Sequence, residues 1–133
     1  MAEIIPFRGW RFGALDQSNY QQLLAPLFDV ISLEERTQLY KRPHNVVHVS
    51  VPQNTDAAKG HWIDWAEKGV VQRDDELCFY LYQQTFRLGD QEYKRRGIIA
   101  LIKVADWNER KILRHEATMS FSVADRLEIL NKT

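Results

Sequence analysis

The chain has 133 residues, of which 44% are hydrophobic and 11% aromatic, and its 18 basic and 18 acidic residues cancel to a formal net charge of zero. This length and composition are typical of one globular domain with a sizeable core, so we expect a single domain over residues 1–133. The balanced charge argues against a global field that would attract nucleic acids or anionic membranes, and no stretch approaches the roughly 20 apolar residues of a membrane span.

Cysteine usage and the N-terminal sequence indicate a compartment. Cys78 is the sole cysteine, so no disulfide can form within the chain, and its apolar neighbours predict a buried, inert thiol. The first residues lack the basic start and apolar stretch of a secretory signal. We therefore predict a cytoplasmic protein.

The N-terminal third is predicted to contain two extended segments and one helix. Residues 4–7 and 26–31 are expected to be extended, the second because its leading proline disfavours helix in the residue before it. Ser32 and Glu35 have the spacing of a capping box, in which the serine oxygen accepts a backbone N–H of the first helical turn. This pattern predicts a helix from Ser32 to about Lys41.

A strand and then a helix are predicted next, because the spacing of the hydrophobic residues changes between the two segments. Residues 46–51 are rich in β-branched side chains and end before a proline, which favours a strand. From Thr55 onward, Trp62 and Trp65 fall at helical spacing, and Gly69 stands where a C-terminal cap is expected. A helix packed through its tryptophans is therefore predicted.

A long hairpin is predicted after this helix. Residues 77–88 and 91–104 both have strand composition, and Gly89 and Asp90 between them form a two-residue turn. The nearly continuous apolar run at residues 98–102 is typical of a strand that is covered on both faces.

One more helix is predicted at the C-terminus. Ser122 and Asp125 again have capping-box spacing, with Leu127 and Leu130 as the buried stripe. Together the elements predict an α+β fold with a mixed, largely antiparallel sheet, a long hairpin and about three helices.

His115 and Glu116 lie between the hairpin and the last helix, where a rigid sheet gives way to a loop. His115 is a candidate general acid or base, and Glu116 could orient a nucleophile or hold a magnesium ion. Adjacent side chains in an extended segment point to opposite sides, so an ordinary solvated pair is the competing interpretation. The residues themselves leave both readings open.

Arginine and aspartate residues form a second group of candidates. Asp29 lies in an apolar segment, where an unpaired carboxylate is costly to bury. Arg8 is a candidate partner, and such a contact would be either a structural clip or the edge of an anion site. Arg126 is predicted either to pair with Glu116 or to receive a phosphate or carboxylate near the last helix, which Asp125 is expected to cap.

Other polar residues receive structural interpretations. His48 is predicted to be a core or edge histidine of a strand, and His61 to lie on a solvated helix face. The basic cluster Lys94-Arg-Arg is predicted to protect an exposed sheet edge from mispairing. The four histidines and single cysteine show no zinc-ligand spacing.

An ordered series of short motifs resembles the N-terminal region of the domain of unknown function 1015 family. The resemblance covers nearly the whole chain. Its motifs are Pro6-Phe-Arg-Gly, Ala25-Pro-Leu-Phe-Asp-Val-Ile-Ser, Asn45-Val-Val, Trp65-Ala-Glu-Lys-Gly-Val, Arg96-Gly-Ile, His115-Glu-Ala-Thr and Asp125-Arg-Leu.

Two departures from the family pattern affect any site. Leu27 and Phe28 replace the Pro-Tyr of the family's Pro-Pro-Tyr, which removes a ring hydroxyl. Members of the family are also longer, and they carry a later Asp-Gly-His-His-Arg segment that this chain does not include. That segment is similar to the signature of the ParB and sulfiredoxin-type superfamily, which contains nucleotide-binding and phosphoryl-transfer proteins.

The resemblance implies that the chain is the N-terminal part of a nucleotide-binding or phosphoryl-transfer protein. In that case His115 and Glu116 would be catalytic, and Arg8, Asp29 and Arg126 would bind the anionic substrate, a nucleotide or a small phosphorylated metabolite, with magnesium. The alternative is a non-catalytic interaction module or remnant. Apolar surface left uncovered in such a chain predicts self-association into a homo-oligomer.

Overall fold

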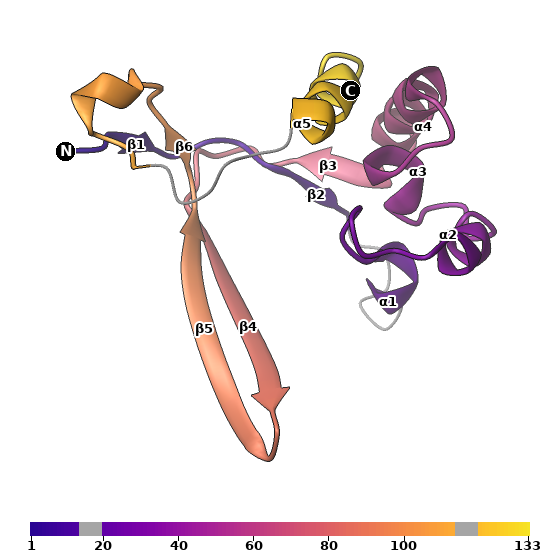
Figure 1. Ribbon diagram of the computed structural model, residues 1–133. Coiled ribbons are helices and arrows are strands. Elements are labelled where there is room, and N and C mark those ends of the chain that lie inside the picture. The colour runs from indigo at the N-terminus through magenta and orange to yellow at the C-terminus, as the bar shows by residue number, and fades with distance from the viewer. Residues whose placement is uncertain (14–19, 114–119) are drawn as a thin grey trace. The chain divides into compact units, whose positions relative to one another are not determined.

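The computed structural model describes residues 1–13, 20–113 and 120–133, and these form the predicted α+β fold (Figure 1). Five α-helices lie within the described residues, against about three expected, because α1 and α3 are additional one-turn helices. The chain divides into two compact units. Unit 1 is Met1–Trp10 with Arg73–Ala117, and unit 2 is Arg11–Gln72 with Thr118–Thr133.

Unit 1 contains a short strand pair at the N-terminus. Strand β1 (Ile4–Ile5) pairs antiparallel with β6 (Leu101–Ile102), which confirms the extended conformation predicted for this part of residues 4–7. Lys103 donates to the Glu3 carboxylate at 3.1 Å beside the pair. A 3₁₀ helix, η2 (Trp107–Glu109), follows and begins with a capping box.

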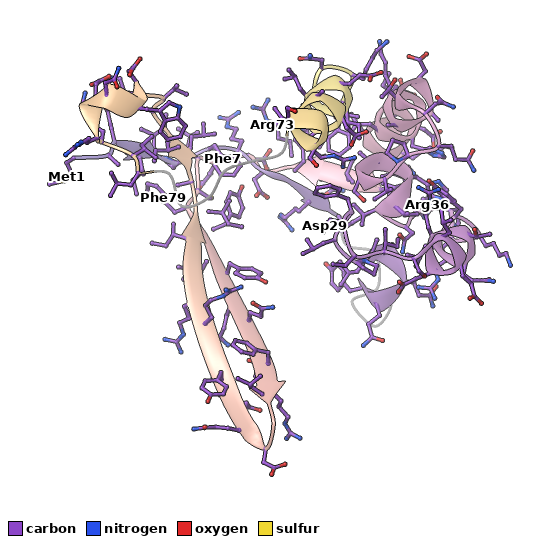
Figure 2. All side chains as sticks on the ribbon, in the orientation of Figure 1. Met1, Phe7, Asp29, Arg36, Arg73 and Phe79 are labelled. Carbon is purple, nitrogen blue, oxygen red and sulfur yellow. The ribbon has the colours of Figure 1, made fainter. Side chains whose placement is uncertain are left out.

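The predicted hairpin is confirmed. Strands β4 (Tyr80–Leu88) and β5 (Gln91–Ile99) pair antiparallel along their whole length, from Tyr80 opposite Ile99 to Leu88 opposite Gln91. They form an elongated ribbon with side chains standing out from both faces (Figures 1 and 2).

The expected double-sided cover of residues 98–102 is wrong. Ile98 is 63% exposed and Leu101 is 49% exposed. The physical reason is that β4 and β5 form a sheet of only two strands in the described part of the chain, so a nearly continuous apolar run here does not indicate a buried strand.

A tyrosine fastens the base of the hairpin within unit 1. The Gly9 N–H donates to the Tyr80 hydroxyl at 2.6 Å, and that hydroxyl donates to the Asp74 carboxylate at 2.6 Å. A Cβ at Gly9 would lie 2.7 Å from the hydroxyl oxygen, so this close approach requires glycine. The hydrogen bond to Asp74 raises the pKa of Tyr80.

Unit 2 is mainly helical. Its helices are α1 (Tyr20–Leu23), α2 (Leu33–Leu39), α3 (Val47–Ser50), α4 (Thr55–Glu67) and α5 (Ser120–Leu130). Strands β2 (Trp10–Phe12) and β3 (Val71–Arg73) pair with each other, and the division between the units falls inside both strands.

Two predicted helices are confirmed by their caps. Ser32 accepts from the Glu35 N–H at 3.2 Å at the start of α2, as the capping-box spacing predicted. Helix α4 begins at Thr55, ends at Glu67, and is followed by Gly69 with a φ of +70°. Trp65 of α4 is 2% exposed and packs with Val70 and Val71, so the tryptophan spacing marked the core.

The strand predicted at residues 46–51 is wrong, because this segment forms helix α3. Asn45, which is fully buried, accepts from the Val47 N–H at 3.0 Å and bends the chain into the first turn. Its amide nitrogen donates to the carbonyls of Gln22 and Leu24, each at 2.7 Å. Tertiary hydrogen bonds therefore override the β-propensity of the valines.

The extended segment predicted at residues 26–31 is also wrong. The backbone N–H groups of Val30 and Ile31 both donate to the Leu27 carbonyl, at 3.1 and 3.2 Å, and close a turn. Asp29 lies exposed in this turn. The assumption that its carboxylate must be buried therefore fails, because the apolar neighbours are themselves largely exposed.

The capping box predicted at the start of the last helix is wrong as well. Helix α5 begins at Ser120, so Ser122 and Asp125 lie inside it. The predicted buried stripe is displaced too: Leu127 is 54% and Leu130 72% exposed, whereas Ile129 is 8% exposed. None of the helices in the described ranges has the length and apolar composition needed to cross a membrane.

Candidate functional site

A pocket of about 450 Å³ in unit 2 contains one of the predicted anion-binding residues, Arg126. We call it the arginine pocket. It adjoins the start of α4 and receives side chains from α2 and α5. Its described lining residues are Phe28, Arg36, Val51, Pro52, Gln53, Asn54, Thr55, Ser122, Asp125, Arg126, Glu128 and Ile129.

Arg126 is held in place by three neighbours. Its guanidinium donates to the Asp125 carboxylate, with Nε 2.8 Å from Oδ2, and to the Ser50 carbonyl. Its Cζ also lies 4.6 Å from the centroid of the Phe28 ring. These contacts fix the direction of the guanidinium, which lowers the conformational entropy lost when it binds an anion.

Arg36, on α2 (Figure 2), is the second arginine of the pocket. It is half-buried, and its guanidinium has no hydrogen-bond or ion-pair partner within the described residues. Two carboxylates also line the pocket, but Asp125 is paired with Arg126, and Glu128 accepts from the Thr55 hydroxyl at 3.1 Å. Arg36 is therefore the cation most available to an incoming anion.

The start of α4 adds polar backbone to the same pocket. The Asn54 side chain accepts from the Ala57 N–H at 2.8 Å, and the 13-residue helix behind it directs the positive end of its dipole toward this end. A negatively charged group beside Asn54 and Thr55 would be favoured by that dipole.

The other predicted site residues have separate outcomes. His115 and Glu116 lie outside the described residues, so their catalytic role remains a prediction. Arg8 is exposed in unit 1 and Asp29 is exposed in unit 2, so the proposed contact between them also remains a prediction. Asp29 follows Phe28 but is not among the described lining residues of the arginine pocket.

The sequence interpretation missed Phe28 and Arg36. The sequence indicates Phe28 only as a departure from the family's tyrosine, whereas in the structure the Arg126 guanidinium lies over the Phe28 ring. Arg36 lies in an ordinary polar stretch of α2 and gives no sequence signal, because its role depends on residues of α4 and α5 that are distant in sequence.

A histidine pair forms a second polar cluster in unit 2. The rings of His48 on α3 and His61 on α4 lie 4.4 Å apart between centroids, and both contact the Trp65 ring. His48 Nε2 lies 2.9 Å from the Arg42 carbonyl. The prediction of a strand histidine at His48 is therefore wrong, because this segment forms helix α3. His61 lies on α4 as predicted, but it is half-buried where α3 packs on α4.

Protonation of His61 is expected to destabilise the protein. Burial, and then the neighbouring His48, lower the pKa of His61 below its ordinary value of 6.5, while Asp64 acts in the opposite direction. Between the lowered pKa of the folded state and pH 6.5, the unfolded chain therefore binds more protons at His61 than the folded chain does. The contribution of neutral His61 to stability is complete above pH 6.5 and is lost as the pH falls through the lowered pKa.

Urea denaturation at pH 8 and at pH 5 measures this effect. The His61→Gln variant should lose less stability than the wild type between the two pH values. His44→Gln, which removes a histidine outside the pair, is the matched control and should keep the wild-type difference. An unchanged pH dependence in His61→Gln would contradict the assignment.

Among the residues that the structure describes, no group of three or more histidine, cysteine, aspartate or glutamate side chains is arranged to hold a metal ion. The fold and the arginine pocket together define an α+β protein with a partly preformed recess that is lined by two arginine and two carboxylate side chains. Comparison with protein-family models matches residues 4–133 to the family described as protein of unknown function (DUF1015).

The chain therefore belongs to the DUF1015 family, as its ordered motifs predicted. No curated protein and no solved structure shows a significant match to it.

Proposed function

We propose that unit 2 binds the phosphate groups of a nucleotide or another small phosphorylated metabolite in the arginine pocket. The observation that carries this proposal is the presence of Arg36 and Arg126 in one recess beside the start of α4. Guanidinium groups bind phosphate oxygens through two parallel hydrogen bonds, and helix starts favour anions. The pocket volume of about 450 Å³ is within the usual range for small-molecule sites.

Arg36 and Arg126 would have different roles. Arg126 is already oriented by Phe28 and Ser50, so it would fix the position of the phosphate. A phosphate would also compete with Asp125 for that guanidinium. Arg36, which has no ionic partner in the described part of the chain, would supply the charge that the pocket otherwise lacks.

The wider proposal is that the chain is part of a nucleotide-binding or phosphoryl-transfer protein. Phosphoryl transfer depends mainly on positioning and on positive charge around the phosphate, and arginines of this kind contribute both. His115 and Glu116 directly precede the segment that leads into α5, which carries Arg126. They would supply proton transfer or a magnesium contact.

Isothermal titration of the wild type with ATP, ADP, pyrophosphate and inorganic phosphate, with and without magnesium, tests the binding. Arg36→Ala should weaken the observed binding by about 10- to 100-fold, because a charged hydrogen bond contributes about 1.5–3 kcal/mol. Arg126→Lys should also weaken it, because lysine keeps the charge but loses the planar fork.

Arg42→Ala is the matched control, because Arg42 is an exposed arginine of unit 2 that does not line the arginine pocket. Binding that survives Arg36→Ala but is lost in Arg42→Ala would move the site to the larger recess that Arg42 lines, of about 630 Å³. No binding of any phosphate compound by the wild type would reject the proposal. If His115 and Glu116 supply proton transfer, His115→Ala and Glu116→Ala should leave binding intact; if Glu116 contacts magnesium, Glu116→Ala should weaken binding only when magnesium is present.

A non-catalytic interaction module is the second candidate. The observation that favours it is the solvent-exposed apolar surface of the β4–β5 ribbon, where Tyr82, Phe86 and Leu88 lie on one face of β4 and are 47%, 41% and 70% exposed. Exposed apolar side chains that share one face are typical of a docking site. A flat phosphate titration together with stable complex formation would support this candidate.

A further inference from the structure

The two outer edges of the β4–β5 ribbon differ in charge. Strand β5 carries four charged residues, Glu92, Lys94, Arg95 and Arg96, whereas the nine residues of β4 include a single charge, at Arg87. Neither strand pairs with a third strand among the described residues. Charged side chains on an edge strand discourage pairing with another chain, so β5 is protected and β4 is open.

We propose that β4 is a dimerisation edge, which pairs antiparallel with β4 of a second copy of this chain to form a four-stranded sheet. An isolated two-stranded hairpin is marginally stable in water, and three or more strands are usually needed. Pairing across β4 meets that need without a different protein. This inference concerns unit 1 and is independent of the ligand proposed for unit 2.

The sequence of β4 fits pairing with itself. A register that uses all nine residues, Tyr80–Leu88, places Gln84 on the two-fold axis and Tyr82 opposite Phe86 of the second copy, twice. Gln83 then faces Thr85, and the single charged residue of the strand faces a leucine. This register brings no like charges together, and facing aromatic side chains stabilise antiparallel strands.

Full-length antiparallel pairing of β5 with a second β5 is unfavourable. Full overlap of Gln91–Ile99 with a second β5 would place Arg95 on the axis against itself and Lys94 opposite Arg96. Like charges directly opposite each other destabilise a sheet. Full-length pairing therefore avoids facing like charges at the β4 edge but not at the β5 edge.

Pairing at β4 would also extend one apolar face across the dimer. Tyr82 and Phe86 are 47% and 41% exposed and lie on the same face of β4. Phe86 stacks on Tyr93 of β5 with ring centroids 5.7 Å apart, so the face already crosses the ribbon. In the dimer these aromatic side chains would form one continuous surface.

Light scattering of the full chain over a range of concentrations, coupled to size exclusion, tests the dimer. The double variant Gln83→Glu/Thr85→Glu places carboxylates opposite each other twice across the proposed axis. In its own hairpin each new carboxylate faces a cation, Arg96 or Lys94, so the ribbon itself should be preserved.

The two single variants are the matched controls, because each places its carboxylate opposite a neutral side chain. The double variant should dimerise about tenfold more weakly or worse, with the singles close to the wild type. Equal effects of the singles and the double would reject this register. A wild type that remains monomeric at the highest concentration would reject the dimer.

Cross-linking gives a second readout that does not depend on those variants. In a Cys78→Ser background, Gln84→Cys should form a disulfide-linked dimer on mild oxidation, because residues facing each other on adjacent strands bring their Cβ atoms within disulfide range. Arg95→Cys, at the centre of β5, is the matched control and should remain monomeric. Equal cross-linking at both positions would indicate non-specific association and overturn the proposal.

Discussion

Truncation of Trp65 to alanine is expected to lower the free energy of unfolding by about 3–5 kcal/mol, the usual cost of removing a large buried aromatic side chain. Trp65 is 2% exposed and packs with Val70 and Val71. Its ring also lies 6.0 Å from the Phe12 ring between centroids, so its loss would leave a cavity between α4 and the β2–β3 pair.

Urea denaturation followed by circular dichroism measures this loss without depending on tryptophan fluorescence. Trp107→Ala is the matched control, because Trp107 lies in unit 1 and is 52% exposed. That variant should lose much less stability, since about half of its side chain is already in water. Equal losses in the two variants would contradict the assignment of Trp65 as the centre of the unit 2 core.

Replacement of Asn45 by alanine is expected to destabilise the protein by about 2–4 kcal/mol, because unsatisfied buried polar groups cost about 1–3 kcal/mol each. Asn45 is fully buried and bonds three backbone groups, those of Gln22, Leu24 and Val47. Alanine would remove all three of these hydrogen bonds.

The Asn45→Asp variant distinguishes the effect of side-chain size on stability from the effect of hydrogen bonding. The aspartate has nearly the same size, but when it is ionised it cannot donate to the two carbonyls that lie 2.7 Å from the amide nitrogen. At neutral pH this variant should be at least as unstable as Asn45→Ala, and it should recover part of its stability in acid, where a protonated carboxyl can donate once. Asn131→Ala, at an exposed position, should change stability by less than about 0.5 kcal/mol.

The sequence predicts those elements whose signals are local. Helices α2 and α4 have caps and spacings encoded within a few residues, and the hairpin is encoded by a two-residue turn between two strand-like segments. Helix α3 is different, because its valines favour a strand and its conformation depends on Asn45 bonding a carbonyl 23 residues earlier. Contacts of that range cannot be inferred from periodicity.

The candidate site also depends in part on local sequence signals and in part on long-range contacts. Arg126 could be proposed from its motif, but Arg36 could not, because the pocket that contains it forms only when α5 packs on the start of α4. That packing includes the hydrogen bond between Thr55 and Glu128, which are 73 residues apart. The assignment of Asp125 as a cap failed for a different reason, because α5 begins at Ser120, earlier than the local capping-box pattern indicated.

The division of the chain into Met1–Trp10 with Arg73–Ala117, and Arg11–Gln72 with Thr118–Thr133, means that neither unit is a continuous stretch of sequence. During translation, therefore, neither unit is completely synthesised before synthesis of the other unit begins. Lys103 must be synthesised before it can pair with Glu3, and Lys132 before it can pair with Asp56. No single proteolytic cut would release either unit intact, and a terminal truncation at either end would remove part of unit 1 or of unit 2.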